Sequence, residues 1–177
     1  MGDENTAASF LPLRKKKNAM SDEEAWEMLC AEETLYGFLG VHGLKGESGM
    51  PYVAPLNFAA DPPEKAIYFH TTVDADSKRN RALAEDGRAC FTVAGPESEL
   101  VSSPDGVACR FTMKFTSVMA FGEVEKVESP AEKARALNLL MEQKSGFDSF
   151  MKVPEQATAI TTIYKLNVAH ISGARKS

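Results

Sequence analysis

Strand-like runs fill most of this chain, and helical signals interrupt them at only three places. The capping boxes Ser21-Asp-Glu-Glu24 and Ser129-Pro-Ala-Glu132 each begin a helix, because the serine hydroxyl and the glutamate satisfy each other's first-turn amides. A third, short helix is capped by Asp76 or Ser77 and ends at Asp86-Gly87. Strands and helices do not alternate, so the pattern argues against a doubly wound parallel sheet and predicts a mainly β fold.

The strands are predicted from runs rich in β-branched and aromatic residues or with alternating apolar residues. They are Leu35–Val41, Tyr52–Ala59, Ile67–Thr71, Arg88–Ala94, Phe111–Glu128 and Thr158–Ile171. We expect a polar loop over Gly95–Gly106 and a bend at Gly122. A small antiparallel barrel with helices on its outside accommodates this count. Because Pro55 cannot donate to a ladder, we expect it at an edge, at a bulge or where a ligand faces the backbone.

Length and composition indicate one globular domain. With 177 residues, of which 44% are hydrophobic and 25% charged, the chain can bury a core but is short for two ordinary domains. We predict a disordered basic leader over residues 1–20 and a single domain over residues 21–177. The leader holds four cations and two acids and so has a net charge of +2. Because the whole chain carries −5, the domain carries −7. This balance argues against nucleic acid as a partner.

The chain carries no recognisable targeting or membrane-spanning segment. No apolar window approaches the roughly 18 to 20 residues that a membrane helix needs, and the basic run Arg14–Lys17 follows apolar residues rather than preceding them. The cysteines Cys30, Cys90 and Cys109 lie far apart, so we predict neither disulfides nor a metal site, and we expect all three to be buried. We therefore expect a cytoplasmic protein that does not bind membranes.

The start of the middle helix has an unusual charge. Lys78, Arg79 and Arg81 crowd its first turn, where each exposed cation costs about 0.3 to 1 kcal/mol against the positive end of the helix dipole. A bound anion would offset this cost, and upstream hydroxyls together with first-turn amides could hold a phosphate. The alternative is an exposed helix whose cations reach into solvent or pair with Asp74 and Asp76. The residues alone do not decide between the two.

No familiar catalytic or nucleotide-binding motif occurs in the chain. The sequence lacks GxGxxG, GxxxxGK[ST], GxSxG and HExxH, so Rossmann, P-loop, hydrolase and zincin functions have no support. His42 and His170 are expected at the surface. His70 ends a strand immediately before the candidate phosphate loop, where its side chain could reach a ligand.

Five segments in register resemble the FMN-binding split-barrel proteins. They are Pro51-Tyr-Val-Ala-Pro-Leu-Asn-Phe58, Ile67-Tyr-Phe-His-Thr-Thr72, Ser77-Lys78, Arg88-Ala-Cys-Phe91 and Thr116-Ser-Val-Met-Ala-Phe-Gly122. Within that superfamily the chain is most similar to the 5-nitroimidazole reductase group, a relative of pyridoxamine 5′-phosphate oxidase. The resemblance implies a six-stranded antiparallel split β-barrel and a homodimer with FMN in two sites at the subunit interface.

The resemblance also assigns residues to the cofactor. It implies that Thr71, Thr72, Ser77 and Lys78 hold the FMN phosphate, and that the strand Pro55, Leu56, Asn57 and Phe58 lies along the isoalloxazine ring. Ser117 matches a flavin-contacting position of the oxidase, and His70 lies near the ring, where it could donate a proton. The chain lacks the oxidase's C-terminal segment with Trp and Arg, which argues against vitamin B6 oxidation.

The resemblance leaves more than one function open. The first is an FMN-dependent oxidoreductase that uses NAD(P)H or another donor to reduce a small organic acceptor such as a nitro-aromatic compound. The second is a binding protein for FMN, or for haem with His70, His42 or His170 as axial ligand. A flavin-free interaction domain is a third.

Overall fold

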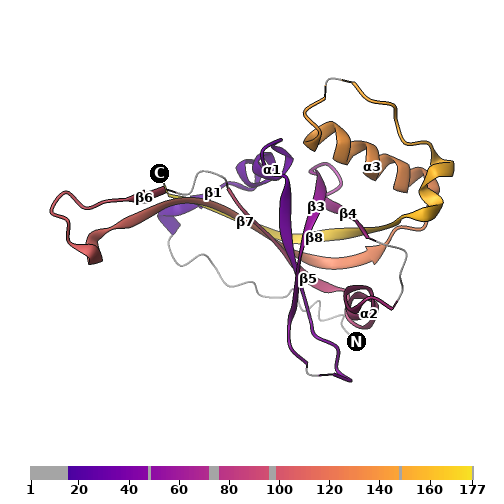
Figure 1. Cartoon of the computed structure of the whole chain (residues 1–177), viewed down its shortest axis with the longest axis horizontal. Coiled ribbons are helices and arrows are strands. Elements are labelled where there is room, and N and C mark those ends of the chain that lie inside the picture. The colour runs from indigo at the N-terminus through magenta and orange to yellow at the C-terminus, as the bar shows by residue number, and fades with distance from the viewer. Residues whose placement is uncertain (1–15, 48, 72–75, 96–98, 148, 177) are drawn as a thin grey trace, which may run out of the picture.

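In a computed structural model, six antiparallel strands form a closed barrel (Figure 1). The structure describes residues 16–47, 49–71, 76–95, 99–147 and 149–176. The barrel strands are β2 (Tyr36–Val41), β3 (Tyr52–Asp61), β4 (Ala66–Thr71), β5 (Arg88–Ala94), β7 (Thr112–Lys126) and β8 (Thr162–Lys176). Their order is β8-β4-β3-β2-β5-β7, and the pairing of β7 with β8 closes the ring. The predicted mainly β, six-stranded antiparallel barrel is confirmed.

Further elements decorate the barrel. Two short strands, β1 (Ala19–Met20) and β6 (Glu99–Val101), pair with β8 and β7. The helices are α1 (Asp22–Cys30), α2 (Lys78–Glu85) and α3 (Pro130–Lys144). Three 3₁₀ turns are η1 (Lys16–Asn18), η2 (Ala108–Arg110) and η3 (Glu155–Ile160). None of the helices in the described residues is long and apolar enough to cross a membrane.

Four expectations from the sequence need correction. Residues 16–20 form η1 and β1 rather than the end of a disordered leader, while residues 1–15 lie outside the described residues. The predicted polar loop contains β6, because part of it pairs with the long strand β7. The last strand begins at Thr162, since Glu155–Ile160 forms η3. Cys109 is exposed, and Cys30 and Cys90 are only partly buried.

The core is formed by the inward-facing residues of the barrel strands. Phe58 and Phe91 are completely buried and contact each other edge to face, with 4.8 Å between their ring centres. Strand alternation places Val118 and Ala120 of β7 inward and their neighbours outward. The outward residues of the barrel therefore remain available for helices or ligands.

Helix α3 is held to the outside of the barrel by a partly buried polar network. Arg135 donates to Asp61 at 2.5 Å and to the Tyr68 hydroxyl at 2.6 Å, and that hydroxyl donates to Glu132 at 3.0 Å. Burial is the main reason that the pKa of Tyr68 is raised. The network joins β3 and β4 to α3 and so supports the strands that follow.

An Arg135→Leu variant is expected to lose about 1 to 3 kcal/mol of unfolding free energy, because the buried Asp61 carboxylate would lose its hydrogen-bonded ion partner. Urea denaturation followed by circular dichroism measures this change. Arg110→Leu is the matched control, since Arg110 pairs with Asp105 at an exposed site. Equal losses in the two variants would contradict the role of the network.

Lys144 joins the ends of α3 and α1. Its Nζ donates to the carbonyls of Leu29 at 2.7 Å and Ala31 at 2.6 Å, and it lies 4.8 Å from the centre of the Phe58 ring. The last carbonyls of α1 are thus satisfied by a cation, which also complements the helix dipole. Burial lowers the pKa of Lys144 to about 8.

This lowered pKa predicts a pH dependence of stability. Between about pH 8 and 10.5 the unfolded chain retains a proton on Lys144 that the folded chain has lost, so the contribution of Lys144 to stability rises with pH through this window. Urea midpoints of the natural chain and of Lys144→Met, measured at pH 7.5 and 9.5, isolate the effect because other groups are common to both. The predicted effect would be contradicted if the urea midpoint of the natural chain did not rise relative to that of Lys144→Met between pH 7.5 and pH 9.5.

Candidate functional site

A groove opens where strands β3 and β4 separate. Their ladder runs from Asp61–Ala66 to Phe58–Phe69 and then ends, although β4 continues to pair with β8 through His70 and Thr71. Asn57 and His70 would form the next pair, but this ladder does not join them. A groove of about 320 Å³ lies here, and its lining residues are Tyr36, Pro55, Leu56, Asn57 and His70.

Alternation along β3 decides which predicted residues face the groove. Pro55 and Asn57 are exposed, whereas Leu56 and Phe58 point into the core. Asn57 is oriented by its side-chain amide, which donates to the Leu35 carbonyl at 3.0 Å. Phe58, one of the predicted ring contacts, has no exposed surface and does not line the groove.

The N-terminus of α2 lies beyond the end of β4. Ser77 is its N-cap, and the Ser77 hydroxyl accepts a hydrogen bond from the backbone N–H of Asn80 at 3.3 Å. This confirms one of the two predicted caps. The Thr71 hydroxyl lies 3.4 Å from Asn80 Oδ1 and donates to it, so Thr71 connects β4 to α2. Thr72, another predicted phosphate contact, lies outside the described residues.

The cations of α2 have mixed environments. Lys78 lies 3.9 Å from Glu47 and Arg81 lies 3.1 Å from it, so Glu47 in the β2–β3 connection takes part of the charge. Arg79 differs, because its Nε is buried and has no hydrogen-bond partner within the described part of the chain. An unpartnered buried nitrogen is costly. An anion at this helix end would supply the missing acceptor.

Ser117 lies on β7, three strands away from β3 around the barrel and outside the lining of the groove. His70 pairs with Ile163 of β8. Ser117 pairs with Ala174, which lies eleven residues further along β8. This is roughly 36 Å of strand length at about 3.3 Å per residue. Ser117 is not among the residues that line the groove, whereas His70 is.

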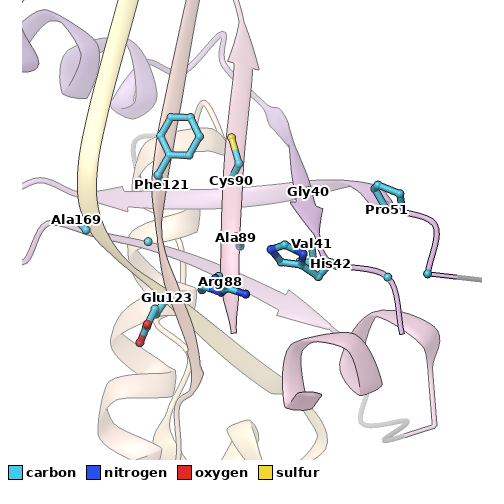
Figure 2. Close-up of a pocket in the computed structure, with 13 residues that line it drawn as sticks. Gly40, Val41, His42, Pro51, Arg88, Ala89, Cys90, Phe121, Glu123 and Ala169 are labelled. Carbon is cyan, nitrogen blue, oxygen red and sulfur yellow. The ribbon is translucent and has the colours of Figure 1, made fainter. Parts of the chain in front are cut away.

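A second, larger hollow of about 510 Å³ lies beside the end of β2 and the β2–β3 connection (Figure 2). Figure 2 shows Phe121 and Cys90 on one side of it, with Arg88 and Glu123 at the other end. His42 also lines this hollow, and the His170 ring lies 6.1 Å from that of Phe121. Sequence reasoning did not assign a site here, because its residues come from four separate strands.

The chain matches the family model described as pyridoxamine 5′-phosphate oxidase over residues 21–175. It belongs to the pyridoxamine 5′-phosphate oxidase family. No curated protein matches the chain. The family assignment agrees with the split-barrel resemblance seen in the sequence.

Solved structures share the fold at low sequence identity. A protein assigned to 5-nitroimidazole antibiotic resistance from Bacteroides thetaiotaomicron is 23% identical, with a TM-score of 0.69 over 88% of this chain and 84% of its own. The flavocytochrome Anf3 from Azotobacter vinelandii is 23% identical, with a TM-score of 0.72 over 94% and 72%. The FAD and haem binding protein from Mycobacterium smegmatis is 17% identical, with a TM-score of 0.69 over 92% and 74%.

Sequence reasoning assigned no site role to two residues of this family member, Tyr36 in the groove and Arg79 in α2. Tyr36 lines the groove and is 56% exposed, an unusual exposure for a large aromatic residue on a barrel strand. Arg79 was noticed as part of the charged helix start but was not assigned to a site. Neither carries a motif, and only their positions in the fold distinguish them.

Proposed function

We propose that this chain is an FMN-binding flavoprotein. The observation that carries the proposal is the end of the β3–β4 ladder beside α2, which leaves a groove containing Pro55, Asn57 and His70. At the adjoining helix N-terminus, the unpartnered Nε of Arg79 fits a phosphate acceptor. Ser77, Lys78 and Arg79 would hold the phosphate, and the groove would hold the ring.

The groove residues have separate tasks in this proposal. Bound FMN would supply the electron-transfer chemistry. Pro55 presents a backbone without an amide hydrogen, and Asn57 is fixed by its bond to Leu35. The exposed His70 side chain lines the groove, and a protonated imidazole can donate to an acceptor there through either ring nitrogen.

We also propose a homodimer with the flavin at the subunit interface. Ser117 does not line the groove of its own chain, so in this proposal Ser117 of the partner subunit would complete the site. A two-fold axis would create two such sites. Sedimentation velocity of the purified protein tests the oligomeric state, and a monomer with a full complement of flavin would refute the shared site.

The proposed activity is reduction of a small organic acceptor, such as a nitro-aromatic compound, with NAD(P)H or another donor. The fold shared with the Bacteroides thetaiotaomicron resistance protein supports this class of acceptor. The test is a visible spectrum of the purified protein, identification of the released chromophore, and NAD(P)H oxidation with and without nitro-aromatic acceptors. Bound FMN without turnover would indicate a non-catalytic flavin carrier. Absence of flavin, both as purified and after addition of FMN, would refute the proposal.

Haem is a second candidate ligand, favoured by the hollow in Figure 2. That hollow combines a histidine, His42, with the aromatic Phe121 and the cation Arg88, which suit an axial ligand, a porphyrin face and a propionate. Two solved structures with this fold are described with haem or as a flavocytochrome. A Soret band lost in His42→Ala but kept in His70→Ala would support haem in this hollow. A spectrum without a Soret band after haem addition would exclude it.

A further inference from the structure

The connection between β2 and β3 lies beside helix α2 (Figure 1). Leu44 of this connection is 5% exposed and belongs to the hydrophobic core. The next residue, Lys45, donates its backbone N–H to the carboxylate of Glu85, the last residue of α2, with 3.1 Å between the two atoms. The connection is therefore held at two points, one in the core and one on α2.

The Glu47 carboxylate of this connection contacts two cations of α2. Its Oε1 accepts a hydrogen bond from Arg81 Nη1 at 3.1 Å, and its Oε2 lies 3.9 Å from Lys78 Nζ. A turn holds the backbone of Glu47, whose N–H donates to the Leu44 carbonyl at 3.1 Å. Glu47 thus brings a negative charge to the end of α2 where the flavin phosphate is proposed to bind.

The two ion pairs of Glu47 differ in strength. The 3.9 Å between Glu47 and Lys78 is too long for a hydrogen bond, whereas Arg81 forms one. Lys78 Nζ also lies 5.9 Å from the centre of the Tyr52 ring, so a carboxylate and an aromatic face share this ammonium group. The three charged side chains are between 40% and 49% exposed, and exposed pairs of this kind contribute little to stability. Lys78 can therefore turn toward a phosphate while Glu47 stays bonded to Arg81.

A phosphate at the start of α2 would meet Glu47 as a competitor. A phosphate monoester carries a charge of about −1.5 to −2 near pH 7, and Glu47 places a like charge beside the same ammonium group. Like charges this close repel each other, and a cation that is already paired attracts the phosphate less. Among the described residues Arg79 forms no ion pair with Glu47, so the site keeps one cation that this carboxylate does not compensate.

We propose that Glu47 competes with the flavin phosphate for Lys78 and so makes FMN a dissociable ligand. This inference rests on the proposed FMN site and deepens it, because it names the residue that controls how readily the flavin is released. The carboxylate recovers its full pairing with Lys78 when the phosphate leaves, which lowers the free energy of the empty site. FMN would therefore exchange with the solution rather than remain permanently bound.

The test compares Glu47→Gln with the natural chain, both at full length. Glutamine keeps the shape of the side chain and removes its charge, and the lost ion pairs are exposed, so the barrel should fold as before. We expect FMN to bind about threefold to tenfold more tightly, the effect of removing one like charge near a phosphate in a water-exposed site. Riboflavin, which has no phosphate, should bind both chains equally. Flavin fluorescence titration measures both affinities.

Glu142→Gln is the matched control for Glu47→Gln. Glu142 is 46% exposed, against 40% for Glu47, and it pairs with an exposed lysine, Lys152, outside α2. This variant should leave both flavin affinities unchanged. Because salt screens charges at exposed sites, the gain in FMN affinity of Glu47→Gln should shrink at high ionic strength. Urea denaturation of both variants checks that the fold is retained.

A double-mutant cycle tests whether Glu47 acts through Lys78. In a Lys78→Ala background, Glu47→Gln should give a smaller gain in FMN affinity, because the shared ammonium group is absent. The same gain with and without Lys78 would overturn competition for this cation.

The rate of FMN release tests the dissociable ligand directly. The natural chain should release FMN on dilution, followed by flavin fluorescence, and Glu47→Gln should release it more slowly. FMN that stays on the natural chain after dilution would overturn the exchangeable ligand.

The remaining outcomes separate this inference from the proposed function. Weaker FMN binding by Glu47→Gln would show that Glu47 positions Lys78 for the phosphate, and this would overturn the competition while leaving the FMN site in place. Unchanged FMN affinity, or an equal gain for FMN and riboflavin, would overturn it as well. A natural chain that binds no added FMN would refute the proposed function, and the inference would fall with it.

Discussion

Lys78→Ala is expected to weaken FMN binding by about tenfold to one hundredfold, because a charge-assisted bond to a phosphate contributes about 1.5 to 3 kcal/mol. Lys78 lies in the first turn of α2, where the helix dipole already favours an anion. Its present partner, Glu47, would keep its ion pair with Arg81, so the fold should survive the change. Flavin fluorescence titration measures the affinity.

Riboflavin provides the decisive comparison for this variant, since it has the same ring as FMN but no phosphate. The loss at Lys78 should therefore be confined to FMN, with riboflavin affinity unchanged. Lys152→Ala is the matched control, because Lys152 is also an exposed lysine paired with a glutamate, Glu142. Equal losses for FMN and riboflavin, or no loss for either, would remove the phosphate assignment.

Gly122→Ala is expected to destabilise the protein by about 3 kcal/mol, the upper end of what overpacking costs. A β-carbon at Gly122 would overlap the backbone carbonyl of Asn167 on β8. Backbone at this point cannot rotate away as a side chain can, because β7 and β8 close the barrel here. The register between them also shifts at Phe121/Gly122, where a bulge leaves Ala169 without a paired residue.

Gly46→Ala is the matched control for Gly122→Ala, because nothing lies within 4 Å of a β-carbon added at Gly46. Thermal and urea unfolding of both variants measure the difference. We expect Gly46→Ala to stay within about 0.5 kcal/mol of the natural chain, as surface substitutions usually do. A Gly122→Ala variant as stable as Gly46→Ala would show that the barrel can open at the bulge without cost.

Local signals predicted the secondary structure well where they act over a few residues. Ser21, Ser77 and Ser129 cap the three helices as expected, and Gly146 follows α3 with a positive φ of 66°. Gly87, at which the sequence predicted the end of α2, does not have a positive φ. It instead lies against the Val124 carbonyl, where a β-carbon would approach to 2.9 Å. A glycine can be required by a close approach of another segment or by a positive φ. The sequence alone does not distinguish these two reasons.

The candidate site was predictable in part. Pro55 marked a place where a ladder is interrupted, and the groove with Asn57 and His70 lies beside it. The cations of α2 suggested an anion, but only the fold shows that Glu47 pairs with two of them while Arg79 retains a buried, unpartnered nitrogen. The alternative considered from the sequence paired these cations with Asp74 and Asp76. It did not include Glu47, which is about thirty residues away in the sequence.

The sequence by itself determined the mainly β class, the helix caps, the family resemblance and the residue types available for a phosphate. These depend on periodicity and on hydrogen bonds between near neighbours, which a linear chain records directly. Only the tertiary structure decided that β3 separates from β4 at the groove and that Ser117 lies outside the groove lining. Those features follow from strand register and barrel closure. Register joins residues that are distant in the chain, so no local pattern encodes it.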